Sequence, residues 1–559
     1  MKNKSIIHIY LVVILTFSSF SLSGMPNKGR DFDLQGFIDK EISSGKKTII
    51  VPEGTYRVKP QNSEHLSFKN LKDITIVANN VEMICTETTR AITFEKCTNV
   101  TIRGLVIDYD PLCFSQGKIT KLSADKSIIE FKLDDNYPDN LVERIEIFDA
   151  KTNLLKRSSH YGWTKFEKIA ERSYRVTKGN KYKFKPTIDT EEVGDILVTN
   201  NDFTPHGNKL HAVFSDECVN LWLENITLYS GNCFGFFETN GTKNTYLKCV
   251  IDRRPPETDM YVRSKRIRSN DADAFHSKFA TIGPQIIECS ARFQGDDGVN
   301  ICGKYYLSTG AVGNVIRLIV PQTCDLSIGT SLEILTMDGK RMPVAKILKI
   351  EDDGLISNKE IEAVLNLKQN ENNKRRLSNP QNKILKLIVD KELTFGFGTV
   401  IADVNKMGNG FLVKNCNFSY NRSRGILIKA SNGSVIGNTL QGNWMTSVLI
   451  SPEAWWLESG CSDNIEVSNN IILDNKQDKA IQITGEGFDG ETAPAGLHNN
   501  INITNNEFTN CFSPVIYVAS TKNGNITGNK ITKPAISIQN VQNSTNAMVI
   551  NCENIKSDF

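Results

Sequence analysis

Short runs of Ile, Val and Leu, each preceded by Asn or Gly, recur along the chain and are clearest toward its C-terminus. Five of them align on one pattern: Asn415–Phe418, Gly437–Leu440, Asn469–Ile472, Asn505–Phe508 and Gly528–Ile531. Successive runs start 22, 32, 36 and 23 residues apart. The shorter intervals suit one coil of a solenoid, and the longer ones suit a coil with a loop.

This repeat predicts an all-β fold, a right-handed parallel β-helix in which short strands stack coil over coil. Asn and Gly suit the corners because they tolerate left-handed backbone conformations. Stacked Asn side chains can also bond from coil to coil, as they do in cross-β structures. A β-sandwich with Asn-rich turns is the alternative, but the irregular spacing and the lack of hairpin turn signals argue against it.

Two Lys-rich stretches, 114–199 and 304–399, lack the Asn corners and alternate apolar and polar residues. That alternation is typical of half-exposed antiparallel strands, so we expect two small β-barrel domains inserted into the solenoid. The chain then divides into a signal peptide at 1–23, a helical cap with the first coils at 30–113, the first insert at 114–199, coils at 200–303, the second insert at 304–399 and C-terminal coils at 400–559.

Composition and the N-terminal pattern indicate where in the cell the protein functions. The 559 residues carry a formal net charge of +3 without a long basic stripe, so nothing points to nucleic acid or a charged membrane surface. Lys2 and Lys4 precede the apolar run Ile6–Phe17 and a Ser-rich stretch ending at Gly24, which is the order of a secretory signal. We expect an exported protein, periplasmic or secreted, without a transmembrane segment. A buried N-terminal strand or helix is the alternative.

The 13 cysteines show no CxxC pair, so a zinc site is not expected, and we interpret them as small buried hydrophobic residues.

The densest acidic cluster joins two segments, Asn270–His276 and Gly295–Asn300, which hold Asp273, Asp296 and Asp297. Asp273 and Asp296 lie 23 residues apart, close to one coil, so they should occupy neighbouring coils, about 4.8 Å apart. Carboxyl groups this close cannot all ionise freely, so the pKa of at least one should rise. Cleavage of a glycosidic bond requires one protonated acid beside ionised partners. A calcium site or an acidic turn is the alternative, weakened by the absence of DxDxDG spacing.

The segment Arg268–Cys302, with its motifs Asp271-Ala272-Asp273 and Gly295-Asp296-Asp297-Gly298, resembles the polygalacturonase-type hydrolases, which have a pectate-lyase-like β-helix. With its two β-rich inserts, the chain resembles glycoside hydrolase family 110 more closely. Members of that family are inverting exo-α-1,3-galactosidases that act on blood-group-B-like termini.

The resemblance implies roles for three aspartates. Asp296 would be the general acid, and Asp273 and Asp297 would hold the attacking water, although the two roles can be exchanged. Inversion requires acid and base about 6.5–9.5 Å apart. Terminal α-galactoside glycans would be the partners, and neither a metal nor another cofactor is implied.

The chain departs from the polygalacturonases in two places. No Gly-His-Gly segment follows the acidic pair, and Gly425–Lys429 keeps the Lys but has Leu427 where that family has Arg. Arg and Lys together would bind a uronate carboxylate, so the loss of the Arg favours a neutral sugar over acidic pectin.

The remaining candidates for substrate binding surround this cluster: Asp271, His276, Glu238, Lys429, Trp455, Trp456 and Arg266. A tryptophan can stack on the face of a galactose or simply pack. The glutamate can bond sugar hydroxyls or lie in a solvated turn, and the histidine can serve the core. The arginine belongs to a basic loop that faces solvent or balances the aspartates.

Two other functions are open on the same fold. A polysaccharide lyase would use Lys or Arg with calcium and release an unsaturated product. A non-catalytic adhesin would use the solenoid as a stalk and would not need clustered aspartates, because a fold alone does not fix function. The sequence also leaves a homodimer open.

Overall fold

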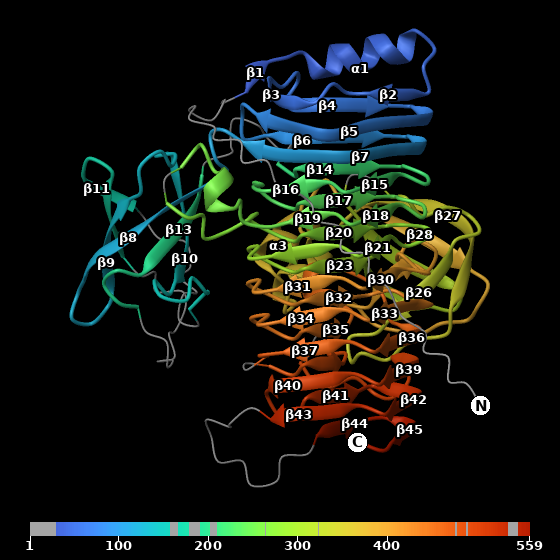
Figure 1. Ribbon diagram of the computed structural model, residues 1–559. Helices are drawn as coiled ribbons and strands as arrows, with labels where there is room; N and C mark the ends of the chain where they lie inside the picture. The colour runs from blue at the N-terminus through green and yellow to red at the C-terminus, as the bar shows by residue number, and fades with distance from the viewer. Residues whose placement is uncertain are drawn as a thin grey trace, which may run out of the picture.

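The computed structural model describes residues 29–156, 166–177, 191–201, 210–262, 264–321, 324–475, 478–487, 490–534 and 546–559. The signal peptide predicted at 1–23 lies outside these residues. The described chain is a parallel β-solenoid with two inserts that stand beside it (Figure 1). This arrangement confirms the fold predicted from the Asn and Gly repeat.

Each coil contributes to two long parallel sheets, which we call sheet A and sheet B. Sheet B stacks 11 strands in this order: β4 (Glu64–Lys69), β6 (Arg90–Glu95), β14 (Val213–Asp216), β17 (Phe236–Thr239), β20 (Phe275–Lys278), β23 (Val299–Cys302), β32 (Ile426–Ile428), β35 (Val448–Ile450), β38 (Ile481–Ile483), β41 (Ile516–Ala519) and β44 (Ala547–Ile550).

Sheet A receives two short strands from most coils. Its 22 strands, in chain order, are β1 (Arg30–Asp31), β2 (Thr48–Ile50), β3 (Gly54–Val58), β5 (Lys72–Cys85), β7 (Thr98–Tyr109), β15 (Trp222–Glu224), β16 (Thr227–Leu228), β18 (Thr245–Leu247), β19 (Val250–Ile251), β21 (Gln285–Ile287), β22 (Ser290–Arg292), β30 (Leu412–Lys414), β31 (Asn417–Ser419), β33 (Gly433–Ile436), β34 (Thr439–Gln441), β36 (Asp463–Ser468), β37 (Ile471–Leu473), β39 (His498–Thr504), β40 (Glu507–Cys511), β42 (Thr521–Thr527), β43 (Lys530–Pro534) and β45 (Glu553–Ser557).

The corners between paired strands of sheet A carry the predicted Asn ladder. The first residue of each repeat has a left-handed backbone, with φ of 55° at Asn415 and 67° at Gly437. The next residue faces inward and bonds to its equivalents on neighbouring coils, donating from Nδ2 to Oδ1 at 2.9 Å along Asn438, Asn470, Asn506 and Asn529. The repeat therefore encodes both the turn and the bond that holds successive turns together.

On the coils closer to the N-terminus, cysteines occupy the ladder position that Asn occupies on the later coils. The backbone N–H of Cys416 donates to Asn438 Oδ1, and the N–H of Cys289 donates to the Sγ of Cys416. Ten of the 13 cysteines are buried. They pack as small hydrophobic side chains, as the sequence predicts.

The first insert leaves sheet A after β7 and is an antiparallel sheet. Its strands lie in the order β10 (Leu141–Phe148), β13 (Ile196–Asn201), β8 (Phe114–Leu122), β9 (Ile128–Leu133), β12 (Ser173–Thr177) and β11 (Phe166–Ala170). Among the described strands, no pairing joins the two ends of this order, so here the insert differs from the barrel that we expected. Alternating strands predict a sheet with one covered face, but not its closure.

The second insert follows β23 and is a closed barrel. Its strands lie in the order β24 (Tyr306–Val312), β25 (Val315–Val320), β28 (Lys383–Val389), β27 (Ala345–Leu355), β26 (Ser331–Leu335) and β29 (Val400–Asp403). Two helices, α2 (Asn358–Asn366) and α3 (Glu371–Leu377), connect β27 to β28.

A helix covers the N-terminal end of the solenoid. In α1 (Leu34–Ser43), the side chain of Asp33 caps the first turn by accepting from the N–H of Gly36, and Leu34 and Ile38 pack onto the core. Such a cap shields core side chains and strand edges that the first coil would otherwise expose. Two short 3-10 turns complete the described helices: η2 (Pro256–Thr258) and η3 (Ala454–Trp456).

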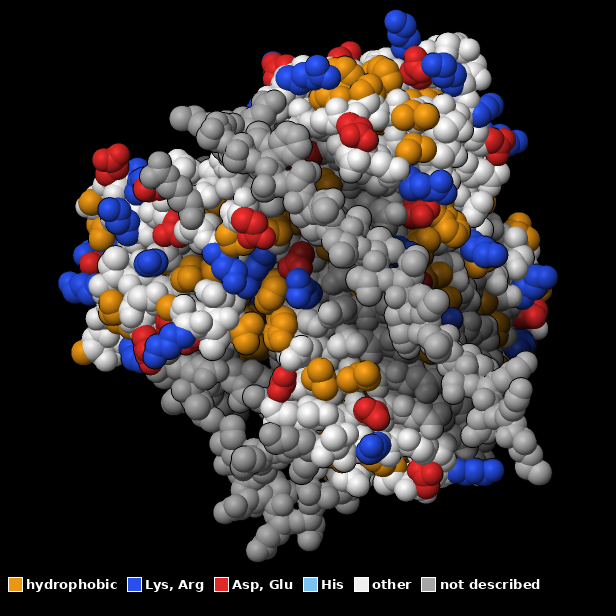
Figure 2. Space-filling model, in the orientation of Figure 1, with side chains coloured by type: hydrophobic (Ala, Val, Ile, Leu, Met, Phe, Trp, Pro, Cys, Tyr) orange, Lys and Arg blue, Asp and Glu red, His pale blue; other side chains and the backbone are white. Residues whose placement is uncertain are grey.

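No described helix has the length and apolar character needed to cross a bilayer. On the face drawn in Figure 2, Lys and Arg side chains are interspersed with Asp and Glu side chains.

Candidate active site

One column of side chains crosses three successive coils at the corner that precedes sheet B. Asp273, Asp297 and Arg424 each lie two residues before a strand, and the register of β20, β23 and β32 makes these positions equivalent. Gly295 lets neighbouring corners approach closely, because a Cβ there would lie 2.2 Å from the backbone oxygen of Asp271. The parallel stack therefore brings together residues that are far apart in the chain.

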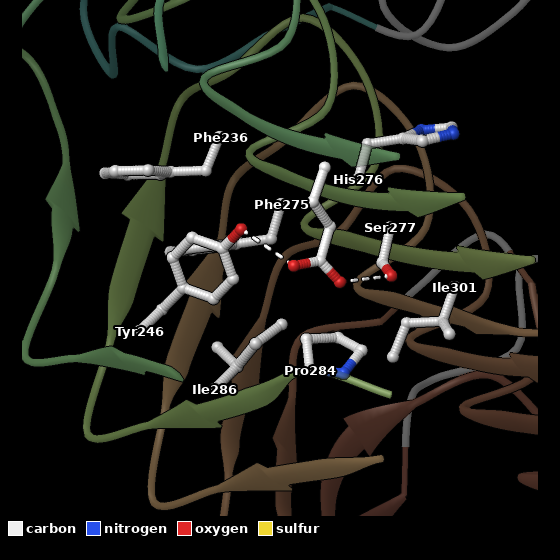
Figure 3. A pocket seen from close by; sticks show the side chains of 9 residues that line it. Phe236, Tyr246, Phe275, His276, Ser277, Pro284, Ile286 and Ile301 are labelled. Atoms are coloured by element: carbon white, nitrogen blue, oxygen red, sulfur yellow. Dashed lines mark hydrogen bonds between the residues drawn. The ribbon is translucent and has the colours of Figure 1, made fainter. Parts of the chain in front are cut away.

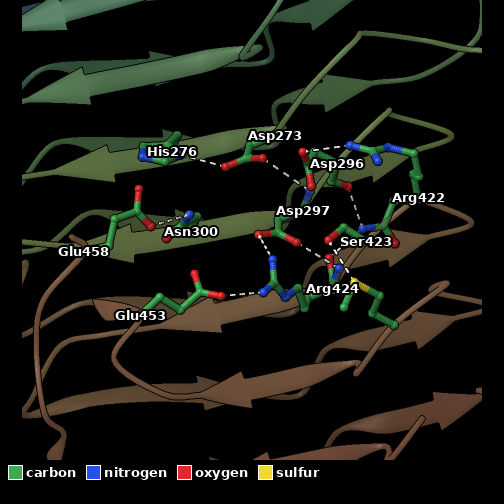
Figure 4. Close-up of polar contacts among 12 residues, drawn as sticks. Asp273, His276, Asp296, Asp297, Asn300, Arg422, Ser423, Arg424, Glu453 and Glu458 are labelled. Atoms are coloured by element: carbon green, nitrogen blue, oxygen red, sulfur yellow. Dashed lines mark hydrogen bonds and ion pairs between the residues drawn. The ribbon is translucent and has the colours of Figure 1, made fainter. Parts of the chain in front are cut away.

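The three predicted aspartates lie together in this corner (Figure 4). One carboxylate oxygen of each lies within 4.8 Å of the others. Asp273 is bonded on two sides, since its Oδ2 lies 2.6 Å from Nδ1 of His276 and its Oδ1 accepts the N–H of Asp297 at 3.3 Å. Asp297 accepts the N–H of Arg424 at 2.8 Å and lies 3.5 Å from its guanidinium.

Asp296 differs from its two neighbours in exposure. Its side chain is 34% exposed, whereas those of Asp273 and Asp297 are 6% and 3% exposed. Its Oδ2 lies 3.0 Å from the guanidinium of Arg422. Asp296 is thus the carboxyl group most open to solvent, and the other two form the floor beneath it.

Burial governs the proton affinity of the cluster. It raises the pKa of Asp273 well above the ordinary value, and the charges of Asp296 and Glu458 raise it further. Burial also raises the pKa of Asp297, against the opposing charge of Arg424. The corner therefore keeps a proton to higher pH than exposed aspartates would, chiefly because of burial and to a smaller extent because of the crowding on which the sequence prediction rested.

His276 supports Asp273 from sheet B. Burial and the charge of Lys278 lower its pKa to about 3, so the imidazole is neutral at neutral pH. Its ring stacks on Phe234, with centroids 4.4 Å apart, and its Nε2 has no hydrogen-bond partner among the described residues. The aromatic contact fixes the plane of the ring and so the direction of its bond to Asp273.

Lys429 is fully buried and lies beneath the site. Its Nζ lies 3.0 Å from Glu453 and 2.9 Å from Glu458. Burial alone would lower the pKa of Lys429, but these two glutamates hold it above the ordinary value. The same Glu453 pairs with Arg424, so the lysine positions carboxylates at the edge of the site.

The first insert also reaches the site. Glu146, on β10, lies 3.2 Å from Arg422 and 3.4 Å from Arg268. Arg268 in turn pairs with Asp271 at 3.2 Å, and Asn200 on β13 donates to Asp271 at 2.6 Å. Asp271 is therefore engaged in a buried network that joins the insert to the corner, next to the three aspartates.

Two sequence candidates lie elsewhere. Glu238 points into the solenoid, where it accepts from Ser277 at 2.6 Å and from Tyr246 at 3.2 Å. Figure 3 shows these two donors in the lining of one small pocket. The inward position of Glu238 on β17 explains these contacts, because side chains of a strand alternate between faces. Arg266 is fully buried and pairs with Asp108 and Asp259. The structure thus places neither residue at the site.

The two tryptophans border a pocket next to the aspartates. Trp455 is 45% exposed and Trp456 is 55% exposed, both on the turn η3. The pocket has a volume of about 360 Å³, and its lining includes Arg424 and Glu453. The tryptophans are therefore near the carboxyl cluster without touching it.

Sequence reasoning missed four charged residues of the site: Arg422, Arg424, Glu453 and Glu458. A signal for one of them was present. Gly298-Val299 follows Asp297 just as Gly425-Ile426 follows Arg424, so extending the repeat across the second insert would have aligned the two positions. The glutamates lie in a loop without a repeat signal, and only the folded chain brings them to the corner.

The aspartate oxygens are of the type that hard cations prefer. However, those of Asp273 and Asp297 already bond to His276, Arg424 and backbone N–H groups, and two arginines balance the charge. This bonding fits acid–base chemistry better than metal coordination.

A second group, His276, Cys302 and Glu458, also lies within 4.8 Å. Its glutamate pairs with Lys278 and Lys429, and burial raises the pKa of Cys302 to about 12, so the thiol is not the thiolate that a metal needs. Neither residue is therefore prepared to bind an ion.

Comparison with known proteins supports the fold and the chemistry. Residues 394–554 match the family described as "Right handed beta helix region". Alpha-1,3-galactosidase B of Bacteroides thetaiotaomicron is 22% identical over 482 residues, which cover 78% of this chain and 72% of that protein. Alpha-1,3-galactosidase A of Bacteroides fragilis is 22% identical over 541 residues, covering 87% of this chain and 82% of that protein.

Two solved structures are also similar in outline. The A-module of the mannuronan C-5 epimerase AlgE4 of Azotobacter vinelandii is 10% identical with a TM-score of 0.38, covering 92% of this chain and 94% of that chain. The family 28 exopolygalacturonase of Yersinia enterocolitica is 8% identical with a TM-score of 0.33, covering 93% and 74%.

The parallel β-helix fold is shown by the sheet topology and the family model, and the sequence relatives support a glycoside hydrolase on that fold. More particularly, the chain is similar over most of its length to proteins named alpha-1,3-galactosidase, which confirms the resemblance to glycoside hydrolase family 110.

Proposed function

We propose that this protein is an exo-acting hydrolase that releases galactose from terminal α-1,3-linked galactosides, either blood-group-B-type or linear. The observation that carries the proposal is the corner at which Asp273, Asp296 and Asp297 approach within 4.8 Å, two of them with raised pKa values. The names of the curated relatives support the linkage and the sugar. The N-terminal pattern supports export of the protein, which the mass of its mature form would test.

In the proposed reaction, the cluster carries one proton to the glycosidic oxygen and an ionised carboxylate activates a water. Asp296 is the donor, because its exposure gives it access to a departing sugar. Asp273 and Asp297 hold the water from the floor of the corner. Burial raises the pKa of Asp297, and the charge of Arg424 opposes that rise, so Asp297 serves as the ionised base only above its raised pKa.

We propose inversion at the anomeric carbon, on the strength of the family resemblance. One observation favours retention instead. The nearest carboxylate oxygens lie within 4.8 Å, nearer to the separation of about 5–5.5 Å in retaining enzymes than to the larger gap of inverting ones. Proton NMR during the first minutes of hydrolysis distinguishes the two, because inversion releases β-galactose and retention releases α-galactose.

The test of the proposed function uses the purified full-length chain with linear α-1,3-galactobiose and the fucosylated B-type trisaccharide. Galactose should appear from at least one of them. Release from neither substrate would overturn the substrate assignment. A product that absorbs in the ultraviolet would instead identify a lyase, and binding of the glycans without turnover would identify an adhesin.

A further inference from the structure

Two pairs of cysteines occupy equivalent positions on the coils that flank the two inserts. Cys97 follows β6 and Cys218 follows β14, and the register of these neighbouring strands places one cysteine beside the other (Figure 1). The first insert lies between them in the sequence, so the two cysteines are 121 residues apart. Cys289 and Cys416 flank the second insert in the same way, because the pairings of β21 with β30 and of β22 with β31 align them. Each insert therefore interrupts the chain between two stacked thiols.

The pair at the first insert has no third cysteine next to it in its column. The column continues with Leu71 on the coil before and with Gly241 on the coil after, as the parallel pairings of the following residues show. In the column at the second insert, by contrast, Cys289 has a bonded thiol on both sides. At the first insert, Cys97 and Cys218 can therefore react only with each other.

The geometry of this corner suits a covalent bond between the two sulfurs. Equivalent residues on adjacent coils lie about 4.8 Å apart, and the Cα atoms of a disulfide are usually about 4.4–6.8 Å apart. The thiols of Cys97 and Cys218 already bond to each other. Both residues are buried, with 1% and 0% of their surface exposed, so the bond would lie inside the solenoid.

Cys97 is the more acidic of the two thiols. The bond from Cys218 lowers the pKa of Cys97 to about 7, whereas the same bond and burial raise the pKa of Cys218. At the second insert, burial raises the pKa of both Cys289 and Cys416 well above the ordinary value. The thiolate is the form that attacks a disulfide. Of these four sulfurs, that of Cys97 is therefore the one ready to react near neutral pH.

We propose that Cys97 and Cys218 form a disulfide that joins the coil before the first insert to the coil after it. The thiolate of Cys97 attacks the disulfide of an oxidised donor, such as glutathione disulfide, and forms a mixed disulfide while one donor thiol leaves. Cys218 then gives up its proton and displaces the second donor thiol. The two cysteines are thus oxidised, and the disulfide of the donor is reduced to two thiols.

The inference rests on the export that the proposed function includes, because disulfides persist in oxidising compartments. It is independent of the galactosidase activity. Its physical consequence is stability. A crosslink that closes a long loop restricts the unfolded chain strongly, and this one would enclose the whole first insert. The oxidised chain should therefore resist urea better than the reduced chain.

The test measures the crosslink in the full chain. Wild-type protein is unfolded in urea, refolded with oxidised and reduced glutathione, alkylated and digested without reduction. We expect a peptide that joins Cys97 to Cys218 to account for most of the Cys97 recovered by mass spectrometry. Dithiothreitol should lower the urea midpoint of the oxidised chain by about 0.5 M or more. Cys97→Ala should remove both the crosslink and this shift. Cys511→Ala, at a buried residue of β40, is the matched control and should keep both.

Separate recovery of Cys97 and Cys218 as alkylated thiols would overturn the inference, as would Cys97 joined to several cysteines in similar amounts. A crosslink whose reduction leaves the urea midpoint unmoved would overturn its role in stability. If Cys97→Ala does not refold, Cys218→Ala provides the same comparison.

These measurements use no substrate, so the inference and the proposed function fail separately. A crosslinked chain that releases no galactose would refute the activity alone. A chain that releases galactose but keeps both thiols free would refute the disulfide alone.

Discussion

Asp297 has the most complete set of bonds in the corner, from the backbone and the guanidinium of Arg424. Asp297→Asn keeps the size of the side chain but removes its charge. We expect kcat/KM on a terminal α-galactoside to fall about 10³-fold, the scale of a lost acid–base group. The melting temperature should stay close to that of the wild type. Asp252→Asn removes the charge from a different pair, the one with Arg292, and is the control, which should keep full activity.

The charge of Arg424 makes a separate prediction about pH. Burial raises the pKa of Asp297 and Arg424 lowers it, so Arg424→Gln should raise that pKa further. If the ionised form of Asp297 is needed, activity is lost as pH falls through its pKa. The acidic limb of the kcat/KM profile should therefore move up by about one pH unit. An unmoved limb in Arg424→Gln would show that this limb does not report on Asp297. Arg292→Gln should leave the profile unchanged.

Glu238 makes the stability of the solenoid core depend on pH. Burial raises its pKa, and bonds from Ser277, Asn244 and Tyr246 oppose this only in part. An acid whose pKa is raised on folding loses stability as pH rises from the unfolded pKa to the folded one. Glu238→Gln removes that loss, about 1.4 kcal/mol for each pH unit of the interval. The variant should gain stability against the wild type in urea at pH 8, and gain little at pH 4.

At the scale of the strand and its corner, the Asn ladder is the element that the sequence describes best. Asn470 is fully buried, accepts from Asn438 and donates to Asn506 and to the oxygen of Val435. Asn470→Ala leaves those partners unsatisfied and should lower the free energy of unfolding by about 3 kcal/mol. Asn502→Ala, at a half-buried residue of β39 that bonds to Asn525 outside the ladder, should cost less than about 1 kcal/mol. Equal midpoints of urea denaturation for the two variants would contradict a structural role of the ladder.

The same scale shows what the sequence could and could not provide. The corner signal is local, since Asn or Gly must adopt a left-handed backbone at one residue, so a repeat such as Asn469-Asn470 predicts its own structure. The acidic cluster was also accessible, because one coil separates Asp273 from Asp296. By contrast, Glu238 was assigned to the wrong face, since three-residue and four-residue strands give too little alternation to tell inside from outside.

At the scale of the whole molecule, buried ion pairs connect the first insert to the solenoid. Glu146 of the first insert lies between Arg268 and Arg422, and Arg422 contacts Asp296. Glu146→Gln should therefore loosen Asp296 and lower kcat/KM about tenfold, as changes behind a catalytic group do. Glu130→Gln, in the surface pair with Arg175 of the same insert, is the control. If the two variants keep equal activity, the insert does not support the site.

Contacts of this long range account for most of what sequence reasoning missed. Glu146 and Arg422 are 276 residues apart, and no repeat relates the antiparallel insert to the solenoid. The loop that carries Glu453 and Glu458 is likewise placed by the barrel insert, through Gln369 and Ala454. Periodicity predicts neighbours within the stack, but it does not say which insert folds back onto which corner.

The buried cysteines stacked between coils can report how often the solenoid opens. Cys289 and Cys416 are enclosed between coils, where a thiol reagent cannot reach them while the stack is intact. Alkylation of these two sulfurs should therefore require separation of the coils, whereas the partly exposed Cys324 should react in the native state. Mass spectrometry after timed alkylation would measure how often the middle of the solenoid opens, and such opening exposes the backbone to proteases and the thiols to oxidants.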